Sequence, residues 1–216
     1  MNNQIFKISD QITIEEVETI YQKNFEKIIY EFFNLESEWL FNAYDAYKDV
    51  DKHLILIYIV HKTFETYNKH FYKVSFEKFY NNSHIEIEKI SIIDLVRSLL
   101  ISKETARRKL NELSREGVLT RKLKNIRINK VNSNPKLEKN VFNLSKLLYI
   151  FCRNLKKDHK LENLSRLEIE KKICENYTHY WNLFFKFQIP YILRCKKVFS
   201  SIDSFYIFGL CVLNEA

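Results

Sequence analysis

The chain has 216 residues, of which 46% are hydrophobic and 29% are charged, and its formal net charge is +8. This length allows one domain, or a small module with helical extensions, and the apolar content suffices for a sizeable core. Only two glycines and two prolines are present. This disfavours an all-β fold, which needs many turn residues, so the expected fold class is mainly α. The sequence contains no glycine-rich phosphate loop and no G-x-S-x-G or H-E-x-x-H motif, so we expect no enzyme and no cofactor.

The sequence carries no sign of export or of a bound metal. The first ten residues lack the basic region and apolar core of a signal peptide, and the apolar run from Phe205 to Leu213 is too short to span a bilayer. The four cysteines, Cys152, Cys174, Cys195 and Cys211, form no C-x-x-C motif. We therefore expect buried thiols rather than zinc ligands, with a redox-sensing thiol as the alternative.

Residues 1–50 are predicted to form an N-terminal helical extension. The segment Thr13-Ile14-Glu15-Glu16 has the pattern of a capping box, in which hydroxyl and carboxylate cap the first turn. The helix that it opens has an apolar period close to 3.6 residues and is predicted to end near Asn34. A second helix is predicted at 36–47.

A third helix is predicted from Asp51 to about Tyr72. Its middle, residues 54–60, is apolar on all sides, which is typical of a helix that is buried centrally or at a subunit interface. We interpret it as the helix that packs behind the two short helices described next. Its histidines are eight and nine residues apart, which does not place them one turn from each other, so we expect packing roles rather than a metal site.

Two short helices are predicted between residues 91 and 117. Ser91-Ile92-Ile93-Asp94 resembles a capping box and opens the first helix, with the apolar period Ile93, Val96, Leu99 and Leu100. Ser102 is a candidate N-cap for the second helix. In that helix Ala106, Leu110 and Leu113 are spaced to face inward. Gly117 is expected to end it in a left-handed conformation.

A small β-structure is predicted around this helix pair. Ile126-Arg127-Ile128 alternates as a strand does, and 119–130 is expected to form a two-stranded wing with its turn near 123–125. Residues 85–90 also alternate and are a candidate for a short first strand that pairs with the wing. The order helix, tight turn, helix, ribbon is that of a winged helix-turn-helix, whose second helix enters the major groove of DNA.

The distribution of charge favours the same interpretation. Residues 97–130 contain eleven Lys and Arg and three Glu, a net +8 that equals the charge of the whole chain, 35 basic against 27 acidic residues. The remainder, 24 basic and 24 acidic residues, is neutral. A basic patch confined to one module is the expected footprint of a surface that contacts phosphates. The alternative is a solvated basic hairpin without a ligand.

The candidate DNA-contacting residues are polar side chains of the second helix and of the wing: Ser102, Lys103, Glu104, Thr105, Arg107, Arg108, Asn111, Arg121, Lys122 and Lys124. The long side chains near the start of the helix are predicted to project away from its inward face and to reach the bases. The three wing residues are predicted to contact phosphate or the minor groove.

The segment Ser102-Lys103-Glu104-Thr105-Ala106-Arg107-Arg108, followed by Gly117-Val118-Leu119, resembles the helix-turn-helix of bacterial winged-helix regulators. The nearest match is the Crp/Fnr type, whose recognition helix typically reads S-R-E-T-x-x-R. The resemblance implies that Lys103, in place of the family's arginine, takes a base-reading position together with Glu104 and Arg108. That family's cyclic-nucleotide-binding β-jelly roll is not recognisable, and the order of helices around the module is more similar to MarR-type regulators.

After a boundary at 132–135, three helices are predicted at 136–157, 161–188 and 191–213, with Pro190 breaking the pattern. They are interpreted as a packing or dimerisation layer. An aromatic stripe on the second of them is expected to be core or dimer interface. The alternative is a site for a small apolar effector, formed by the stripe together with residues of the 36–47 helix: Tyr177, Tyr180, Trp181 and Phe184, with Trp39 and Tyr44.

These patterns predict a sequence-specific regulator of transcription that places 102–116 in the major groove of double-stranded DNA and 119–130 on the backbone or minor groove. The expected parts are the helical extension 1–50, the winged module 51–131 and a C-terminal region at 136–216. We expect a homodimer, because one module contacts only a short half-site, and a cytoplasmic location on the nucleoid without membrane contact. The alternatives are a replication-initiation or DNA-architectural protein using the same module, and a winged helix that binds only proteins.

Overall fold

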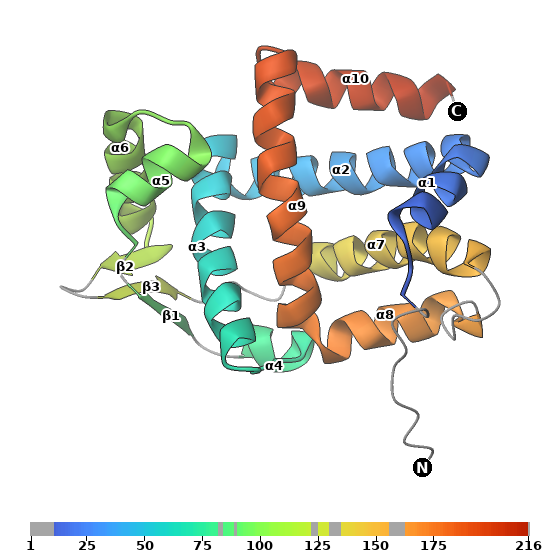
Figure 1. Ribbon diagram of the computed structural model, residues 1–216. Coiled ribbons are helices and arrows are strands. Elements are labelled where there is room, and N and C mark those ends of the chain that lie inside the picture. Colours follow the sequence, from blue (N-terminus) through green and yellow to red (C-terminus); the bar gives the residue numbers. More distant parts are fainter. Residues whose placement is uncertain are drawn as a thin grey trace.

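The computed structural model describes residues 11–81, 84–88, 90–121, 125–129, 135–155 and 163–215, and it is mainly helical with one small antiparallel sheet (Figure 1). This confirms the predicted fold class. The elements in chain order are α1 (Ile14–Lys23), α2 (Phe25–Tyr47), α3 (Val50–Lys69), α4 (Phe76–Asn81), β1 (His84–Glu88), α5 (Ile92–Leu99), α6 (Lys103–Arg115), β2 (Leu119–Arg121), β3 (Asn125–Asn129), α7 (Pro135–Asn154), α8 (Arg166–Glu175), α9 (Tyr177–Val198) and α10 (Ile202–Glu215).

The first helix begins where predicted, but the helix predicted at 36–47 is the second half of a longer helix, α2, that begins at Phe25. The Thr13 hydroxyl accepts a hydrogen bond from the Glu16 amide at 3.2 Å, which confirms the predicted N-cap. The predicted helix end near Asn34 is wrong, because α2 runs through this position. The break lies at Asn24, whose backbone N–H and side-chain amide both donate to the Ile20 carbonyl, at 3.1 and 2.9 Å.

An asparagine also lies at the break between two of the C-terminal helices, α8 and α9. Asn176 donates its side-chain amide to the Lys172 carbonyl at 3.3 Å and separates α8 from α9, so the predicted continuous helix at 161–188 is wrong. Pro190 does not end a helix but lies inside α9, so the helix predicted to start at 191 is wrong as well. Pro190 and Lys186 lie on the exposed side of α9, where water can bind the carbonyl that the missing proline N–H leaves free.

Helix α3 is the centre of the core. Its six consecutive residues 54–59 are all buried, as the apolar sequence predicts. One side of α3 packs against α2 and α9, and the other against α5 and α6, so that it stands between the helical layer and the helix-turn-helix (Figure 1). Ser98 of α5 donates to the Tyr58 hydroxyl of α3 at 3.0 Å. This confirms the prediction that the third helix packs behind the two short ones.

The sheet has the strand order β1-β3-β2, and both pairs are antiparallel. Ile128 of the central strand lies opposite Ile85 of β1 and Leu119 of β2. Residues Ile126 and Ile128 are buried, whereas Arg127 between them is half-buried, which is the alternation that the sequence indicated. The predicted pairing of the first strand with the wing is confirmed.

The helical layer consists of α1, α2 and α7 to α10, and its core is largely aromatic. Tyr177, at the start of α9, is 1% exposed and its hydroxyl lies 2.8 Å from that of Tyr80 in α4. Trp181 stacks on Tyr177 with ring centroids 5.1 Å apart, and Phe184 follows one turn later. These side chains pack in the protein interior, whereas Tyr44 is 53% exposed. In the part of the chain that the structure describes, no helix combines the length and apolar character required to cross a membrane.

Candidate nucleic-acid interface

A serine caps the start of each of the two helices α5 and α6, and a left-handed residue lies in the turn between them. The Ser91 and Ser102 hydroxyls each accept a hydrogen bond from the amide three residues on, at 3.0 Å, which confirms both predicted N-caps. Leu100 ends α5 with φ of 53°. Leu95 and Leu99 form the inner face of α5. The predicted apolar period is therefore right at Leu99 and wrong at Ile93 and Leu100, which are 62% and 76% exposed.

Helix α6 is fixed on its inner side and at its end. Ala106, Leu110 and Leu113 are at most 1% exposed, as predicted from their spacing. Gly117 has φ of +73°, its amide donates to Ser114, and the next amide, of Val118, donates to Leu113 at 3.0 Å. These two bonds form a Schellman motif, which satisfies the last carbonyls of the helix and requires the left-handed residue that glycine supplies.

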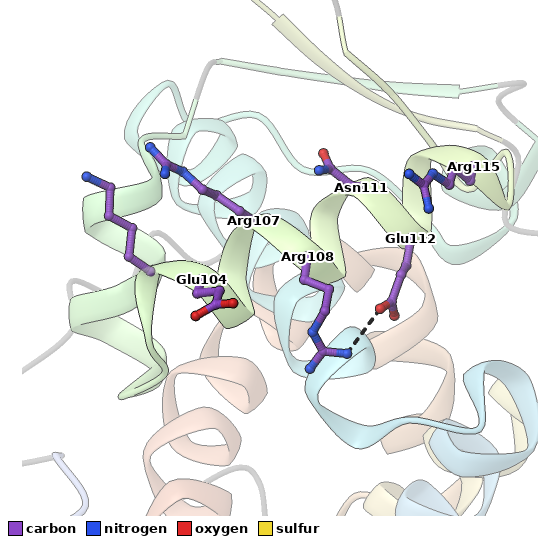
Figure 2. A pocket seen from close by; sticks show the side chains of 7 residues that line it. Glu104, Arg107, Arg108, Asn111, Glu112 and Arg115 are labelled. Atoms are coloured by element: carbon purple, nitrogen blue, oxygen red, sulfur yellow. Dashed lines mark hydrogen bonds and ion pairs between the residues drawn. The ribbon is translucent and has the colours of Figure 1, made fainter.

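The outer side of α6 is an open surface of polar and charged side chains lined by Lys103, Glu104, Arg107, Arg108, Asn111, Glu112 and Arg115. Figure 2 shows them in two rows along the helix: Arg107, Asn111 and Arg115 in one, and Glu104, Arg108 and Glu112 in the other. Five of these seven were predicted as DNA-contacting residues. Arg115 and Glu112 were not, although their four-residue spacing from Asn111 and Arg108 places them in the same rows.

Two predicted site residues lie at the start of α6 and have a capping role. The Ser102 and Thr105 hydroxyls are 2.9 Å apart, and Ser102 holds the Thr105 amide. Ser102 is exposed and Thr105 is half-buried. The first amides of α6 carry the partial positive charge of a helix N-terminus, which favours an anion such as a phosphate nearby.

Arg108 is held by a neighbour on its own helix. Its Nη1 donates to Oε1 of Glu112 at 3.1 Å, and the side chain remains 58% exposed. The pair limits the rotamers of Arg108 while leaving its other guanidinium donors free of Glu112 (Figure 2). A side chain restricted in this way loses less conformational entropy when it binds a base or a phosphate.

A cluster of five charged residues, which we call the α6 anchor, attaches the helix to α3 and was not predicted. Lys109 of α6 pairs with Asp49, the N-cap of α3, and lies 3.4 Å from Glu112. Lys52 of α3 pairs with Glu112 at 3.3 Å and with Glu116 at 2.5 Å. Both lysine side chains are only 10% exposed. Lys109 thus belongs to the anchor and not to the outer surface of α6.

The pKa directions within the anchor agree with this pairing. The hydrogen bond to Glu116 raises the pKa of Lys52, although burial acts against it. Partial burial raises the pKa of Asp49, but the hydrogen bond from Lys109 and the neighbouring charges outweigh it, so that this pKa is lowered. Asp49 and Lys52 are therefore both charged at neutral pH, which favours the ion pairs of the anchor.

The wing is tied to the end of α6 by one asparagine. Asn129 donates its side-chain amide to the Gly117 carbonyl at 2.6 Å and to the Thr120 hydroxyl at 3.0 Å. Arg121 ends β2, and its backbone pairs with that of Ile126. The other two predicted wing contacts, Lys122 and Lys124, lie outside the described residues.

Comparison with known families assigns residues 86–130 to the DeoR-like helix-turn-helix domain. The matched segment covers β1 from its third residue, α5, α6 and the wing, and the match supports a DNA-binding role for this module. Neither the search of curated proteins nor that of solved structures gave a match. Among the described residues no group of His, Cys, Asp and Glu side chains is arranged to hold a metal ion.

Proposed function

We propose that the protein is a sequence-specific regulator of transcription that binds double-stranded DNA with α6 in the major groove and the wing on the backbone or in the minor groove. The observation that carries the proposal is that the two sides of α6 differ. Its inner side is fixed by apolar packing and by the α6 anchor, and its outer side presents Arg107, Arg108, Asn111 and Arg115. A rigid helix with such an outer side is what major-groove reading requires.

The chemistry of the outer side fits base reading. Arginine can donate two hydrogen bonds to guanine O6 and N7, and asparagine can bind adenine N6 and N7 in the same bidentate way. Arg107 and Arg108 lie in the first half of α6, and Asn111 lies one turn after Arg107 (Figure 2). The residues near the start of a recognition helix are those that reach base edges. We therefore assign base reading to these three together with Lys103 and Glu104, and phosphate contacts to Ser102, Arg115 and the wing.

The experiment that tests the proposal selects bound duplexes from a random pool and then measures affinity for the selected site by fluorescence anisotropy. Selection of one sequence motif, with binding lost when Arg107 and Arg108 are both changed to Ala, supports the proposal. The matched control is Lys171→Ala, which removes an exposed charge (75% side-chain exposure) on α8, away from the helix-turn-helix. Equal weakening by the control, or no selected motif, would contradict sequence-specific reading through α6.

We also propose a homodimer, and a small apolar effector that binds within the helical layer. The support for the effector is an almost wholly apolar cavity of about 490 Å³ between α1, α2, α7 and α9, which Phe32, Leu147 and Phe184 help to line. Its volume is in the range of small-molecule sites. Of the aromatic stripe on α9, only Phe184 contributes to this cavity. Filling it by Leu147→Trp should abolish any change in DNA affinity caused by an apolar extract, with DNA affinity itself retained.

A further inference from the structure

Helix α10 is apolar on all sides, although only one side of it is covered. Between Asp203 and Glu215 it contains no charged residue. Ile202, Phe205 and Gly209 face inward and are buried. Gly209 allows close contact with α2, because a Cβ at this position would come within 3.1 Å of the Phe33 ring. A helix that is hydrophobic all round is normally buried all round.

The uncovered side of α10 carries large apolar side chains. Ile207 is 60% exposed and Phe208 is 45% exposed, and Leu210 and Cys211 are exposed next to them. The apolar surface continues onto α2 across a groove that Phe25, Tyr30 and Cys211 help to line. Three charged residues also line this groove: Glu26, Lys27 and Glu215. We call these six residues the α10 patch: Phe25, Tyr30, Ile207, Phe208, Leu210 and Cys211.

We propose that the α10 patch is the surface on which a second copy of this chain binds, with the two α10 helices packed against each other across a two-fold axis. The inference deepens the proposed function and rests on it for its role in DNA binding, because it names the surface of the homodimer. In a two-fold interface the same residues meet on both sides, so the apolar side chains of the α10 patch can pack against their own copies. A partner with charged groups at this position would leave them without counter-charges on α10.

The exposed apolar area of the α10 patch agrees with binding of a second copy of the chain. The exposed parts of its six side chains amount to about 500 Å², since one aromatic side chain presents roughly 200 Å² when fully exposed. An interface of standard size covers about 800 Å² on each partner, and in homodimers about 65% of that area is apolar. The α10 patch therefore supplies about the apolar area that a stable homodimer requires.

Sedimentation equilibrium over a micromolar concentration series tests the proposal on the full chain. The wild-type chain should be a dimer, and the double substitution Ile207→Glu with Leu210→Glu should weaken dimerisation by about 100-fold or more, because it places four charges in one interface. The matched control is Leu167→Glu, which charges a leucine on α8 that is 67% exposed and should leave the dimer intact. Circular dichroism checks that both variants remain folded.

A second measurement does not depend on destabilising changes. A short bis-maleimide should cross-link two copies of the wild-type chain through Cys211, the one exposed cysteine among the described residues, and the Cys211→Ser variant should give no cross-linked dimer. A wild-type monomer throughout the micromolar range would overturn the proposal, as would a dimer that the double substitution leaves unchanged. A monomer that floats with phosphatidylglycerol vesicles, and ceases to do so after the double substitution, would also overturn it and would assign the patch to a membrane surface.

Failure of the interface and failure of the proposed function are distinguishable. If the chain is a monomer but loses DNA binding on Arg107→Ala and Arg108→Ala, only the α10 patch is wrongly assigned. If the chain dimerises through α10 but binds no DNA, the proposed function fails while the interface stands.

Discussion

Arg108, on the outer side of α6, donates a hydrogen bond to Glu112 of the same helix at 3.1 Å. Its orientation is therefore set before DNA arrives. Arg108→Ala should weaken binding to the selected site by about 1–3 kcal/mol and relax the preference at one base position. Fluorescence anisotropy with the selected duplex and its single-base variants measures both effects. Unchanged affinity together with unchanged base preference would remove Arg108 from the reading surface.

Glu36 gives the protein a pH-dependent stability. It is 1% exposed, accepts one hydrogen bond from Gln188 at 2.7 Å, and its second oxygen has no partner among the described residues. Burial raises its pKa to about 8. Because the folded pKa lies above the unfolded value, the contribution to stability is complete below about pH 4.5 and is lost as the pH rises through 8.

The corresponding prediction compares wild type with Glu36→Gln in chemical denaturation between pH 5 and 9. The unfolding free energy of the wild type should fall by several kcal/mol over this window, because a charge must form in the core. The Gln variant should lack this part of the pH dependence. Parallel curves for the two proteins would show that the Glu36 carboxyl finds a solvated environment.

His53 makes a second pH-dependent contribution to stability, one that is lost in acid. Its ring packs against Trp39 with centroids 4.7 Å apart, and both ring nitrogens are shielded from solvent with no hydrogen-bond partner among the described residues. Burial lowers its pKa to about 4. Since the folded pKa is below the unfolded one, its contribution is present above about pH 6.5 and is lost as the pH falls through 4. His53→Phe should lose this acid sensitivity, as measured by thermal unfolding between pH 4 and 7.

At the scale of single elements, the α6 anchor makes the position of the recognition helix depend on α3. Lys109→Met leaves the partly buried Asp49 carboxylate without its ion-pair partner, which should cost about 1–3 kcal/mol of stability. DNA affinity should fall as well, because α6 loses its fixed position. Lys103→Met is the matched control on the exposed side of the same helix and should leave the unfolding free energy nearly unchanged.

Local sequence patterns predicted the features that depend on a single helix. Ser102, Gly117 and the inward spacing of Ala106, Leu110 and Leu113 act within one helix, so the sequence indicated them correctly. The anchor pair Lys109 and Asp49 is separated by 60 residues, and nothing in the local sequence of either marks the other. An ion pair of this kind becomes visible only when the packing of α3 against α6 is known.

Helix ends were the least predictable feature. Asn24 and Asn176 each end one helix and start the next by binding a carbonyl four residues back, and the apolar period continues across both positions. Pro190 shows the opposite case, a residue that breaks most helices but is accommodated on the exposed side of α9. In both cases the surrounding packing decides the outcome, and an apolar period does not report it.

At the scale of the whole molecule, the buried core is continuous from the helix-turn-helix to the helical layer. Leu99 and Leu113 of the module belong to the same cluster as Ile59 of α3 and Trp181 of α9. The division into parts at residues 50 and 131 remains a prediction. We expect a single cooperative thermal transition when circular dichroism and tryptophan fluorescence are followed together. Two separated transitions would show instead that the module unfolds on its own.

The position of α3 has a consequence for genetics. The segment that matches the DeoR-like domain begins at residue 86 and lacks α3, although α3 covers the inner sides of α5 and α6. An isolated 86–130 fragment would therefore expose its apolar side and should not fold. In a screen for loss of regulation, inactivating substitutions should map to α3 and to the side of α9 that packs on it as often as to α6. A map of such alleles would outline the support of the reading helix, and not only the residues that contact DNA.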